Sequence, residues 1–222
     1  MFNVAIDGPA GAGKSTIAKI VAKKIGFIYV DTGAMYRTIA LACDRAGIDA
    51  TDEENVVKQS KNVNVSLGYE NGEQRVYLEN EDVSTQIRQE KIGNMTSAIA
   101  VYPQVREKMV EMQQKLAEKN DVVMDGRDIG TAVLPNADLK VYLTASSRTR
   151  AERRYKELIE KGQQCNIDDI ENDIKERDYR DMNRKVSPLK QAEDAVLVDS
   201  SDMTIDEVVD TIIGLIMQRK NA

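Results

Sequence analysis

A phosphate-loop pattern, GxxxxGK[ST], near the N-terminus constrains this chain more than any other feature. The residues that match it are Gly8, Pro9, Ala10, Gly11, Ala12, Gly13, Lys14 and Ser15, with Thr16 directly after them. An apolar run precedes the pattern and a segment with helical periodicity follows it, which is the strand–loop–helix order that phosphate binding requires. Glycines let successive backbone N–H groups turn toward one anion, and the helix N-terminus adds partial positive charge. We therefore predict that the loop binds a nucleoside triphosphate, with Lys14 reaching its β- and γ-phosphates and the Ser15 hydroxyl ligating Mg²⁺.

Short apolar runs alternate with helical segments along the rest of the chain. Strands are expected at residues 2–6, 27–30, 122–124, 139–143 and 195–198. Helices are expected at residues 15–25, 34–46, 92–119, 147–184 with a break near Gly162, and 204–219, the last with Ile205, Val208, Val209, Ile212, Ile213 and Ile216 on its inner stripe. Residues 62–90 differ, because polar and apolar side chains alternate there around Asn71-Gly72, the preferred two-residue hairpin turn. The sequence predicts an α/β, three-layer fold with a central five-stranded parallel sheet and a small antiparallel insertion.

The absence of histidine excludes several kinds of catalytic site. Ser/His and Cys/His nucleophile pairs, the HExxH zinc site and imidazole acid–base chemistry all require it. Lys and Arg number 31 against 37 Asp and Glu, and the net charge of −6 argues against a chain-wide electrostatic grip on nucleic acid or an anionic membrane. Cys43 and Cys165 lack CxxC spacing, so neither zinc nor a disulfide framework is indicated. We expect a cytoplasmic monomer with small-molecule partners, without a signal peptide or a membrane span.

Three classes of phosphate-loop protein fit these observations: a kinase for a small acceptor, a nucleotide-switch GTPase and an ATP-driven motor. The NKxD guanine motif of GTPases does not occur in the sequence, and motor ATPases are usually longer. A kinase is therefore favoured. Phosphoryl transfer depends on positioning and on neutralising oxygen charge. An acceptor that is itself a phosphate, with a second pKa of about 6, needs no imidazole to deprotonate it. A chain rich in arginine and free of histidine suits such an acceptor.

Polar residues after a predicted strand form the first group of candidate acceptor residues. Asp125-Gly126-Arg127-Asp128 follows the strand at the sheet edge where α/β proteins bind ligands. Asp125 is suited to steering Mg²⁺ through water, Arg127 to holding the acceptor phosphate and Asp128 to holding ribose or base. The alternative interpretation is a surface turn with an internal Arg–Asp pair.

Two further segments carry candidate residues. Arg177, Asp181 and Arg184 recur at i, i+4 and i+7, which places them on one face of a helix. In residues 31–37, Asp31 or Thr32 is suited to capping the next helix, and the alternative is a polar floor for the acceptor. Four arginines also crowd the helix before Gly162, where solubility explains them as well as function does. They are Arg148, Arg150, Arg153 and Arg154.

The motifs GPAGAGKST, DTGAMYR, DGRDIGT and KERDYRDMNRKVSPL occur in this order, and with them the sequence resembles the bacterial cytidylate kinases over nearly all 222 residues. The resemblance implies a phosphate-loop nucleoside-monophosphate kinase fold with core, monophosphate-binding and lid regions. An enlarged insertion in the monophosphate-binding region of that family would account for residues 62–90. The implied reaction transfers the γ-phosphoryl group of MgATP to CMP or dCMP, with ATP and Mg²⁺ as cofactors.

The resemblance also implies roles for individual residues. Thr32 corresponds to a serine or threonine that contacts cytosine, and Arg106 and Asp128 lie near base or sugar. Arg177 and Asp181 correspond to ribose contacts. Phosphate would be held by Arg37, Arg127 and Arg184, and the substrate set includes Gly33 and Tyr36. The implied catalytic set is Lys14, Arg127, Asp128 and Arg184, the metal set is Ser15 and Asp125, and Arg150 and Arg154 of the lid join the phosphate loop in binding ATP.

We thus expect one kinase domain over residues 1–222. Its core would span about residues 1–61, 101–147 and 185–222, its monophosphate-binding insertion about 62–100, and its lid with flanking helices about 148–184. Transfer would be direct and in line, without a covalent enzyme intermediate. The alternatives are another phosphate-loop kinase with an anionic acceptor, such as an adenylate or dephospho-coenzyme A kinase, and a non-catalytic nucleotide-switch protein.

Overall fold

The computed structural model describes residues 1–70 and 73–221 and divides the chain into two compact units, Met1–Ile28 with Asn120–Ala222, and Tyr29–Lys119. The expected Asn71-Gly72 turn lies outside the described residues. Five strands form a sheet in the order β2-β6-β1-β7-β8, with bounds β1 Asn3–Asp7, β2 Ile28–Asp31, β6 Val122–Gly126, β7 Leu139–Thr144 and β8 Val196–Asp199. β1 pairs in parallel with β6 and β7, and β7 with β8. The predicted parallel five-stranded sheet is confirmed.

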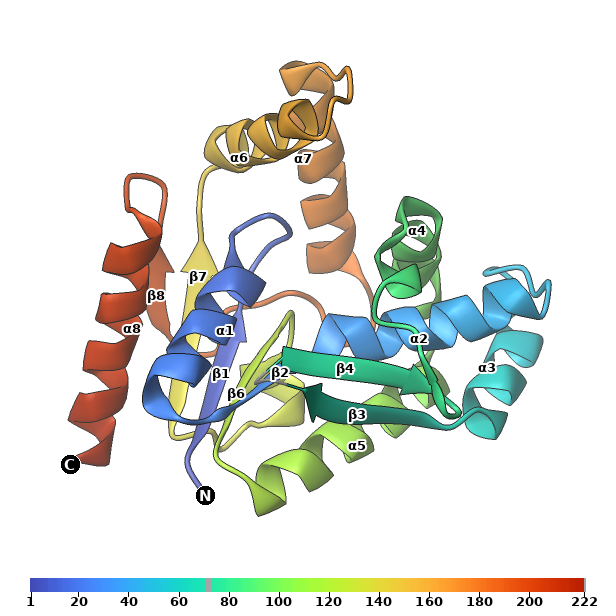
Figure 1. The fold of residues 1–222 in the computed structure, drawn as a ribbon, viewed down its shortest axis with the longest axis horizontal. Coiled ribbons are helices and arrows are strands. Elements are labelled where there is room, and N and C mark those ends of the chain that lie inside the picture. Colours follow the sequence, from blue (N-terminus) through green and yellow to red (C-terminus); the bar gives the residue numbers. More distant parts are fainter. Residues whose placement is uncertain (71–72, 222) are drawn as a thin grey trace. The chain divides into compact units, whose positions relative to one another are not determined.

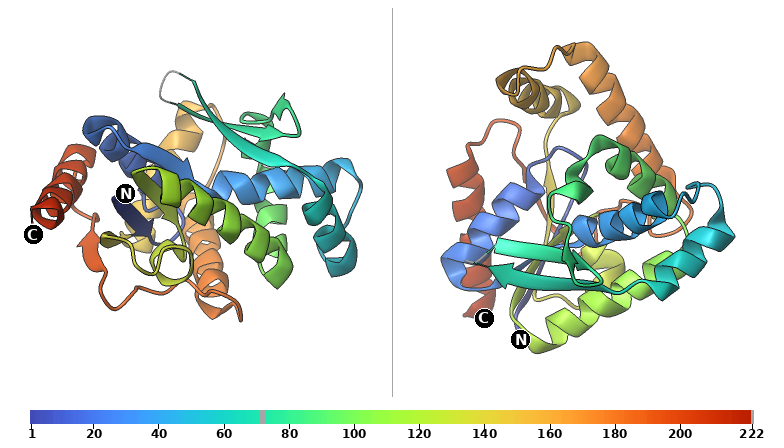
Figure 2. Two further views of the ribbon diagram at one scale, coloured as in Figure 1. Left: turned by 90° about the horizontal axis from the view of Figure 1, so that it is seen from below. Right: turned by 45° about the vertical axis from the view of Figure 1, so that its right-hand side comes forward.

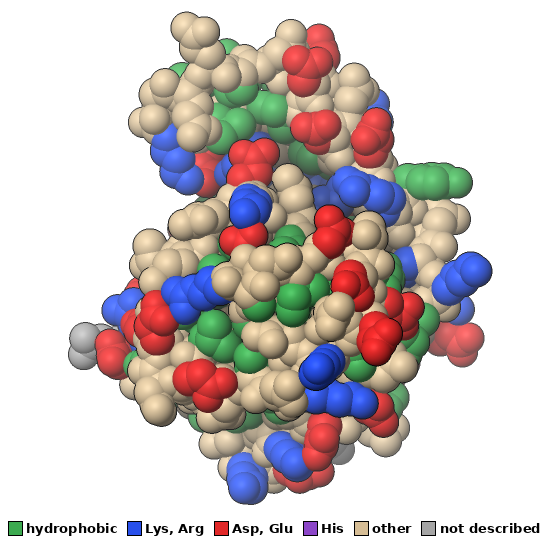
Figure 3. Space-filling view, turned by 90° about the vertical axis from the view of Figure 1, so that its right-hand side faces the viewer, with side chains coloured by type: hydrophobic (Ala, Val, Ile, Leu, Met, Phe, Trp, Pro, Cys, Tyr) green, Lys and Arg blue, Asp and Glu red, His purple; other side chains and the backbone are tan. Residues whose placement is uncertain are grey.

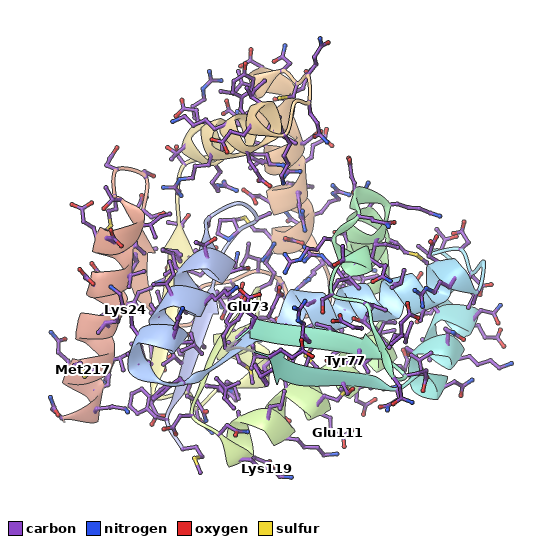
Figure 4. The ribbon with its side chains drawn as sticks, viewed as in Figure 1. Lys24, Glu73, Tyr77, Glu111, Lys119 and Met217 are labelled. Atoms are coloured by element: carbon purple, nitrogen blue, oxygen red, sulfur yellow. The ribbon has the colours of Figure 1, made fainter. Side chains whose placement is uncertain are left out.

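In the first unit, helix α1 (Lys14–Ile25) follows β1 and contacts helix α8 (Ile205–Lys220). The two helices lie side by side (Figure 1), and Lys24 of α1, labelled in Figure 4, lies 3.3 Å from the Asp210 carboxylate of α8. α8 begins with a capping box between Thr204 and Glu207. Its predicted stripe is wrong at one position, since Ile205 is 54% exposed. Ile205 is the first helical residue and precedes the turns that pack, where Val208, Val209, Ile212 and Ile216 are buried.

Helices α6 (Ser147–Glu160) and α7 (Ile167–Asn183) contact each other within the first unit (Figure 1). The break expected near Gly162 is confirmed. Ion pairs join the helices, because Arg148 contacts both Asp168 and Glu171. Arg184, expected on one helical face with Arg177 and Asp181, is the C-cap residue of α7, which ends at Asn183, and the backbone becomes extended from Arg184 onward. Pro188 follows closely, and the KVSP segment does not continue the helix.

The described residues of the second unit form four α-helices, a short 3-10 helix at Gln86–Arg88 and an antiparallel sheet, seen from two sides in Figure 2. The helices are α2 Thr32–Arg45, α3 Glu53–Asn62, α4 Glu90–Ile99 and α5 Pro103–Lys119, and the strands are β3 Val65–Glu70, β4 Glu73–Leu78 and β5 Glu81–Asp82. β3 pairs with β4 from Val65 opposite Leu78 to Glu70 opposite Glu73, so the predicted antiparallel insertion is confirmed. Our sequence analysis missed α3, whose polar composition hides a short amphipathic pattern, and β5, which has two residues.

Side chains of the insertion contact the backbone of β2. The Gln74 amide accepts a hydrogen bond from the Asp31 N–H at 2.8 Å, and the Tyr69 hydroxyl donates to the Tyr29 carbonyl at 3.1 Å. β2 is an edge strand of the sheet, and unpaired backbone groups of an edge strand need partners. The insertion thereby supports the strand that leads into α2. Asp31 itself caps α2, with its carboxylate accepting from the Ala34 N–H at 2.9 Å, so of the two capping residues expected there the structure uses Asp31.

Candidate active site

The phosphate loop follows the central strand of the sheet. Gly8 begins the loop with φ 150°, and a Cβ there would lie 1.9 Å from the Leu143 carbonyl oxygen, so a larger residue cannot occupy this position. At the other end of the loop, Gly13 is the N-cap of α1 and has no side chain that could cap the helix. The first N–H groups of α1 are therefore available for an anion. Ser15 and Thr16, at the start of α1, are exposed.

The amine of Lys14 folds back over this loop. Its side chain is buried, and the Nζ atom donates a hydrogen bond of 2.7 Å to the Pro9 carbonyl oxygen. Burial, and next the positive charge of Arg127, lower the pKa of Lys14 to about 7. A polyphosphate bound at the loop would add negative charge and stabilise the ammonium form. The Lys14 amine therefore lies where a phosphate bound at the loop would favour its protonated, positively charged form.

Two side chains with oxygen atoms come together at the start of α1. The Ser15 hydroxyl donates a hydrogen bond of 2.8 Å to the Asp125 carboxylate, although 110 residues separate them in the sequence. The sheet explains this meeting, because β6, which carries Asp125, pairs in parallel with β1, which leads into the loop. Both residues were predicted as metal ligands.

Arginine–aspartate pairs connect the segment after β6 with the end of α7. The Arg127 Nε atom donates to the Asp181 carboxylate at 2.9 Å, and Arg184 lies 3.7 Å from the Asp128 carboxylate. All four side chains are at least three-quarters buried. Each arginine thus pairs across the site, rather than with its neighbour in the sequence as the surface-turn alternative would have it. Arg177, also on α7, is half-buried.

Asp7, at the end of β1, is a site residue that our sequence analysis missed. Its carboxylate is 4% exposed and accepts hydrogen bonds from the Ile129 and Gly130 N–H groups, at 2.8 and 2.7 Å. Burial raises the pKa of Asp7 to about 6, against the opposing effect of these two bonds. The signal was present in the sequence, since an aspartate that ends an apolar strand is unusual among buried residues.

Arg150 and Arg154, both predicted to bind ATP, have different surroundings. Arg150 is buried, donates to the Ala10 carbonyl of the phosphate loop at 3.0 Å, and pairs with Asp178 of α7 at 2.7 Å. Arg154 is exposed and pairs with Glu157 on its own helix. Arg150 therefore connects α6, α7 and the phosphate loop in this structure.

The remaining predicted substrate residues lie in the second unit, at the start of α2 and on α5. Thr32 and Tyr36 are buried, and Gly33 and Arg37 are half-buried. The guanidinium of Arg106 lies 5.7 Å from the centre of the Tyr36 ring, which brings these two together in a cation–π contact.

A phosphate loop after the central strand of a parallel sheet, with a Ser–Asp pair at its helix and paired arginines beside it, defines a phosphate-loop kinase. The chain belongs to the cytidylate kinase family, since the family described as Cytidylate kinase matches residues 4–218. The resemblance found in the sequence is thus confirmed.

Curated relatives cover nearly the whole chain. A cytidylate kinase of Lactobacillus johnsonii is 47% identical to this chain, and the aligned region covers 99% of this chain and 96% of the relative's length. One of Leuconostoc mesenteroides is 48% identical over 97% of this chain and 96% of its own. Among solved structures, an uncharacterized protein from Eubacterium ventriosum covers 98% of both chains with a TM-score of 0.52 and 15% identity, which supports the fold alone. None of the described helices has the length and apolar composition needed to cross a membrane.

Proposed function

We propose that the chain transfers the γ-phosphoryl group of ATP to CMP or dCMP, giving ADP and CDP or dCDP. The observation that carries this proposal is the Lys14 amine, buried at the phosphate loop within the same unit as the Arg127–Asp181 and Arg184–Asp128 pairs. Family membership supports the cytidine acceptor, since relatives at 47–48% identity are cytidylate kinases.

The charges beside the loop suit two phosphate groups that must approach each other. Arg127 and Arg184 carry permanent positive charge and are largely buried, which strengthens their attraction for an anion. Their aspartate partners, Asp181 and Asp128, hold the guanidinium groups in place before a phosphate arrives. A nucleoside monophosphate is already ionised near neutral pH, so the reaction needs no general base.

Mg²⁺ fits the residues at the loop. Ser15 and Asp125 offer oxygen ligands 2.8 Å apart, and Mg²⁺ prefers one or two protein oxygens together with water and phosphate. When bound, the ion neutralises charge on the transferring phosphates. Ser15 would hold it directly and Asp125 through water, while Lys14 supplies the remaining positive charge at the loop.

We assign the regions of the kinase as follows. The parallel sheet with α1 and α8 is the core, residues of about 62–100 form the monophosphate-binding insertion, and about 148–184 form the lid with its flanking helices. In the second unit, Thr32, Gly33, Tyr36, Arg37 and Arg106 are proposed acceptor-binding residues, and in the first unit Arg177 and Asp181 are. Arg150 and Arg154 would contact ATP after the lid closes, which requires Arg150 to leave its Ala10 and Asp178 partners. Closure would exclude water as a competing acceptor.

An acceptor scan tests the proposal. The protein is incubated with MgATP and, separately, CMP, dCMP, UMP or AMP, and ADP formation and the nucleoside diphosphate product are both measured. We expect CMP and dCMP to be phosphorylated. Faster turnover of AMP would indicate a different monophosphate kinase, and bound nucleotide without any transfer would favour the switch protein.

A further inference from the structure

Asp7 connects the central strand of the sheet to the segment that carries the acceptor arginine. Its two carboxylate oxygens accept from different backbone N–H groups, Oδ1 from Ile129 and Oδ2 from Gly130. The partners are more than 120 positions away in the sequence. Both bonds are buried, so their geometry is protected from competition with water.

The two hydrogen bonds to Asp7 fix the C-terminal end of the short segment that connects Gly126 to Ile129. At its first end, Gly126 is held in the sheet, where it pairs in register with Asp7 itself. At its second end, Ile129 begins a π-helical turn, Ile129–Val133, whose first N–H groups are those that Asp7 accepts from. Only Arg127 and Asp128 lie between the two anchors. The positions of these two residues therefore follow from the position of Asp7.

The phosphate loop begins at the residue that follows Asp7 in the chain. This residue, Gly8, has no room for a side chain, because the Leu143 carbonyl oxygen lies against it. The acceptor segment held by the Asp7 carboxylate is thus linked to the strand from which the donor loop starts. Because phosphoryl transfer depends on the alignment of donor and acceptor, this linkage has a catalytic consequence.

The tight surroundings of Gly130, which donates one of the two hydrogen bonds to Asp7, support this interpretation. A Cβ atom at Gly130 would lie 3.3 Å from the Asp7 Oδ2 atom and 3.1 Å from the Lys140 Cδ atom. A larger residue would therefore press on both the carboxylate and the buried lysine stem. The close approach of the Gly130 N–H to Asp7 therefore leaves little room for a larger residue at this position.

Burying an ionisable group is costly, and the buried strand positions other than Asp7, Asp125 and Lys140 are apolar in the described residues. We propose that Asp7 is a positioning residue for phosphoryl transfer, which holds Arg127 and Asp128 in register with the phosphate loop. This inference rests on the proposed kinase function.

The test compares Asp7→Asn, Asp7→Glu and Gly130→Ala with the wild-type chain, and uses Asp210→Asn, an exposed position on α8, as the matched control. The asparagine amide can accept only one of the two N–H groups, and glutamate keeps the charge but displaces it. For each variant, kcat and the KM for CMP are measured at saturating MgATP, and the Kd for ADP is measured by calorimetry. Thermal unfolding is recorded to identify variants that fail to fold.

We expect kcat to fall about 10- to 100-fold, and the KM for CMP to rise, in all three site variants. The Kd for ADP should change less than about threefold, because Lys14 and the loop N–H groups remain. Asp7→Asn and Gly130→Ala combined should cost less than the product of their separate effects, since both disturb one bond. Unchanged kcat and KM, or parallel losses of ADP and CMP binding, would overturn the assignment of Asp7. A wild-type chain that phosphorylates no monophosphate would instead overturn the proposed function.

Discussion

The Ser15 hydroxyl donates a hydrogen bond to the Asp125 carboxylate at 2.8 Å, which joins the first turn of α1 to the end of β6. This pair provides the oxygen ligands proposed for Mg²⁺. We predict that Asp125→Asn raises the Mg²⁺ concentration needed for half-maximal activity about tenfold, because outer partners of a metal site typically contribute 10- to 100-fold in affinity. Steady-state rates over a Mg²⁺ titration measure the change. Asp202→Asn, at an exposed position, is the control, and equal Mg²⁺ dependence of all three chains would remove Asp125 from the site.

Lys14→Ala should lower turnover by at least about 100-fold while the fold stays intact, since it removes charge stabilisation from the transferring group. The reaction is followed by ADP release, and circular dichroism checks the fold. Lys24→Ala lies on the same helix and pairs on the surface with Asp210, so it should keep wild-type turnover. Full activity of Lys14→Ala would contradict the assignment of the phosphate loop.

The raised pKa of Asp7 predicts a defined pH dependence of stability. Burial moves its pKa from 3.8 to about 6, so between these values the folded chain binds more protons at this group than the unfolded chain. The stabilisation from that proton is complete below about pH 4 and is lost as the pH rises through about 6. The difference in free energy of unfolding between wild type and Asp7→Asn should fall by up to about 3 kcal/mol over this range. Urea unfolding at each pH measures it, and a difference independent of pH would show that Asp7 titrates normally.

In the second unit, the side chain of Lys108 on α5 caps the C-terminal end of helix α3. Its amine donates hydrogen bonds to the carbonyls of Ser60 and Val63, and burial lowers its pKa. Lys108→Met keeps most of the side-chain volume but leaves these carbonyls unpaired, so we predict a loss of about 1–3 kcal/mol in the free energy of unfolding. Lys115→Met, on an exposed turn of the same helix, should change stability by less than about 0.5 kcal/mol. Similar effects of the two substitutions would refute the capping role.

The sequence was sufficient to predict the parallel sheet, because short apolar runs that alternate with helical segments ending at glycine are typical of α/β folds with a parallel sheet. The strands β1, β6, β7 and β8 were each found within two residues of their observed ends. Helix α3 was missed because its buried residues, Val56 and Ser60, are too few to create a clear apolar stripe. The end of α7, expected at residue 184, lies at Asn183, although the charged pattern continues past it into an extended backbone. Charge periodicity alone does not reveal where a helix stops.

The phosphate loop could be predicted residue by residue, since its chemistry is local in the sequence. The pairing of arginines could not. Arg127 and Asp181 are 54 residues apart, and only the tertiary structure brings the end of α7 to the segment that follows β6. Asp7 was overlooked for a related reason. An aspartate at the end of an apolar run is a signal, but its partners are backbone N–H groups, which a sequence does not identify.

Some exposed charges form ion pairs with near neighbours in the sequence, as Lys115 does with Glu111. On the face drawn in Figure 3, Lys and Arg side chains are interspersed with Asp and Glu. The buried arginines of the site, such as Arg150 at the phosphate loop, differ from these surface groups. Because less water screens a buried guanidinium, its electrostatic attraction for an anion is stronger.

A crystal structure of the chain with ADP and CMP bound tests the central claim most directly, since it locates both phosphate groups. The account predicts the diphosphate of ADP against the N–H groups of residues 8–15 beside Lys14, and the CMP phosphate at Arg127 and Arg184, in line with it. A diphosphate bound away from residues 8–15, or a CMP phosphate out of line with it, would contradict the account.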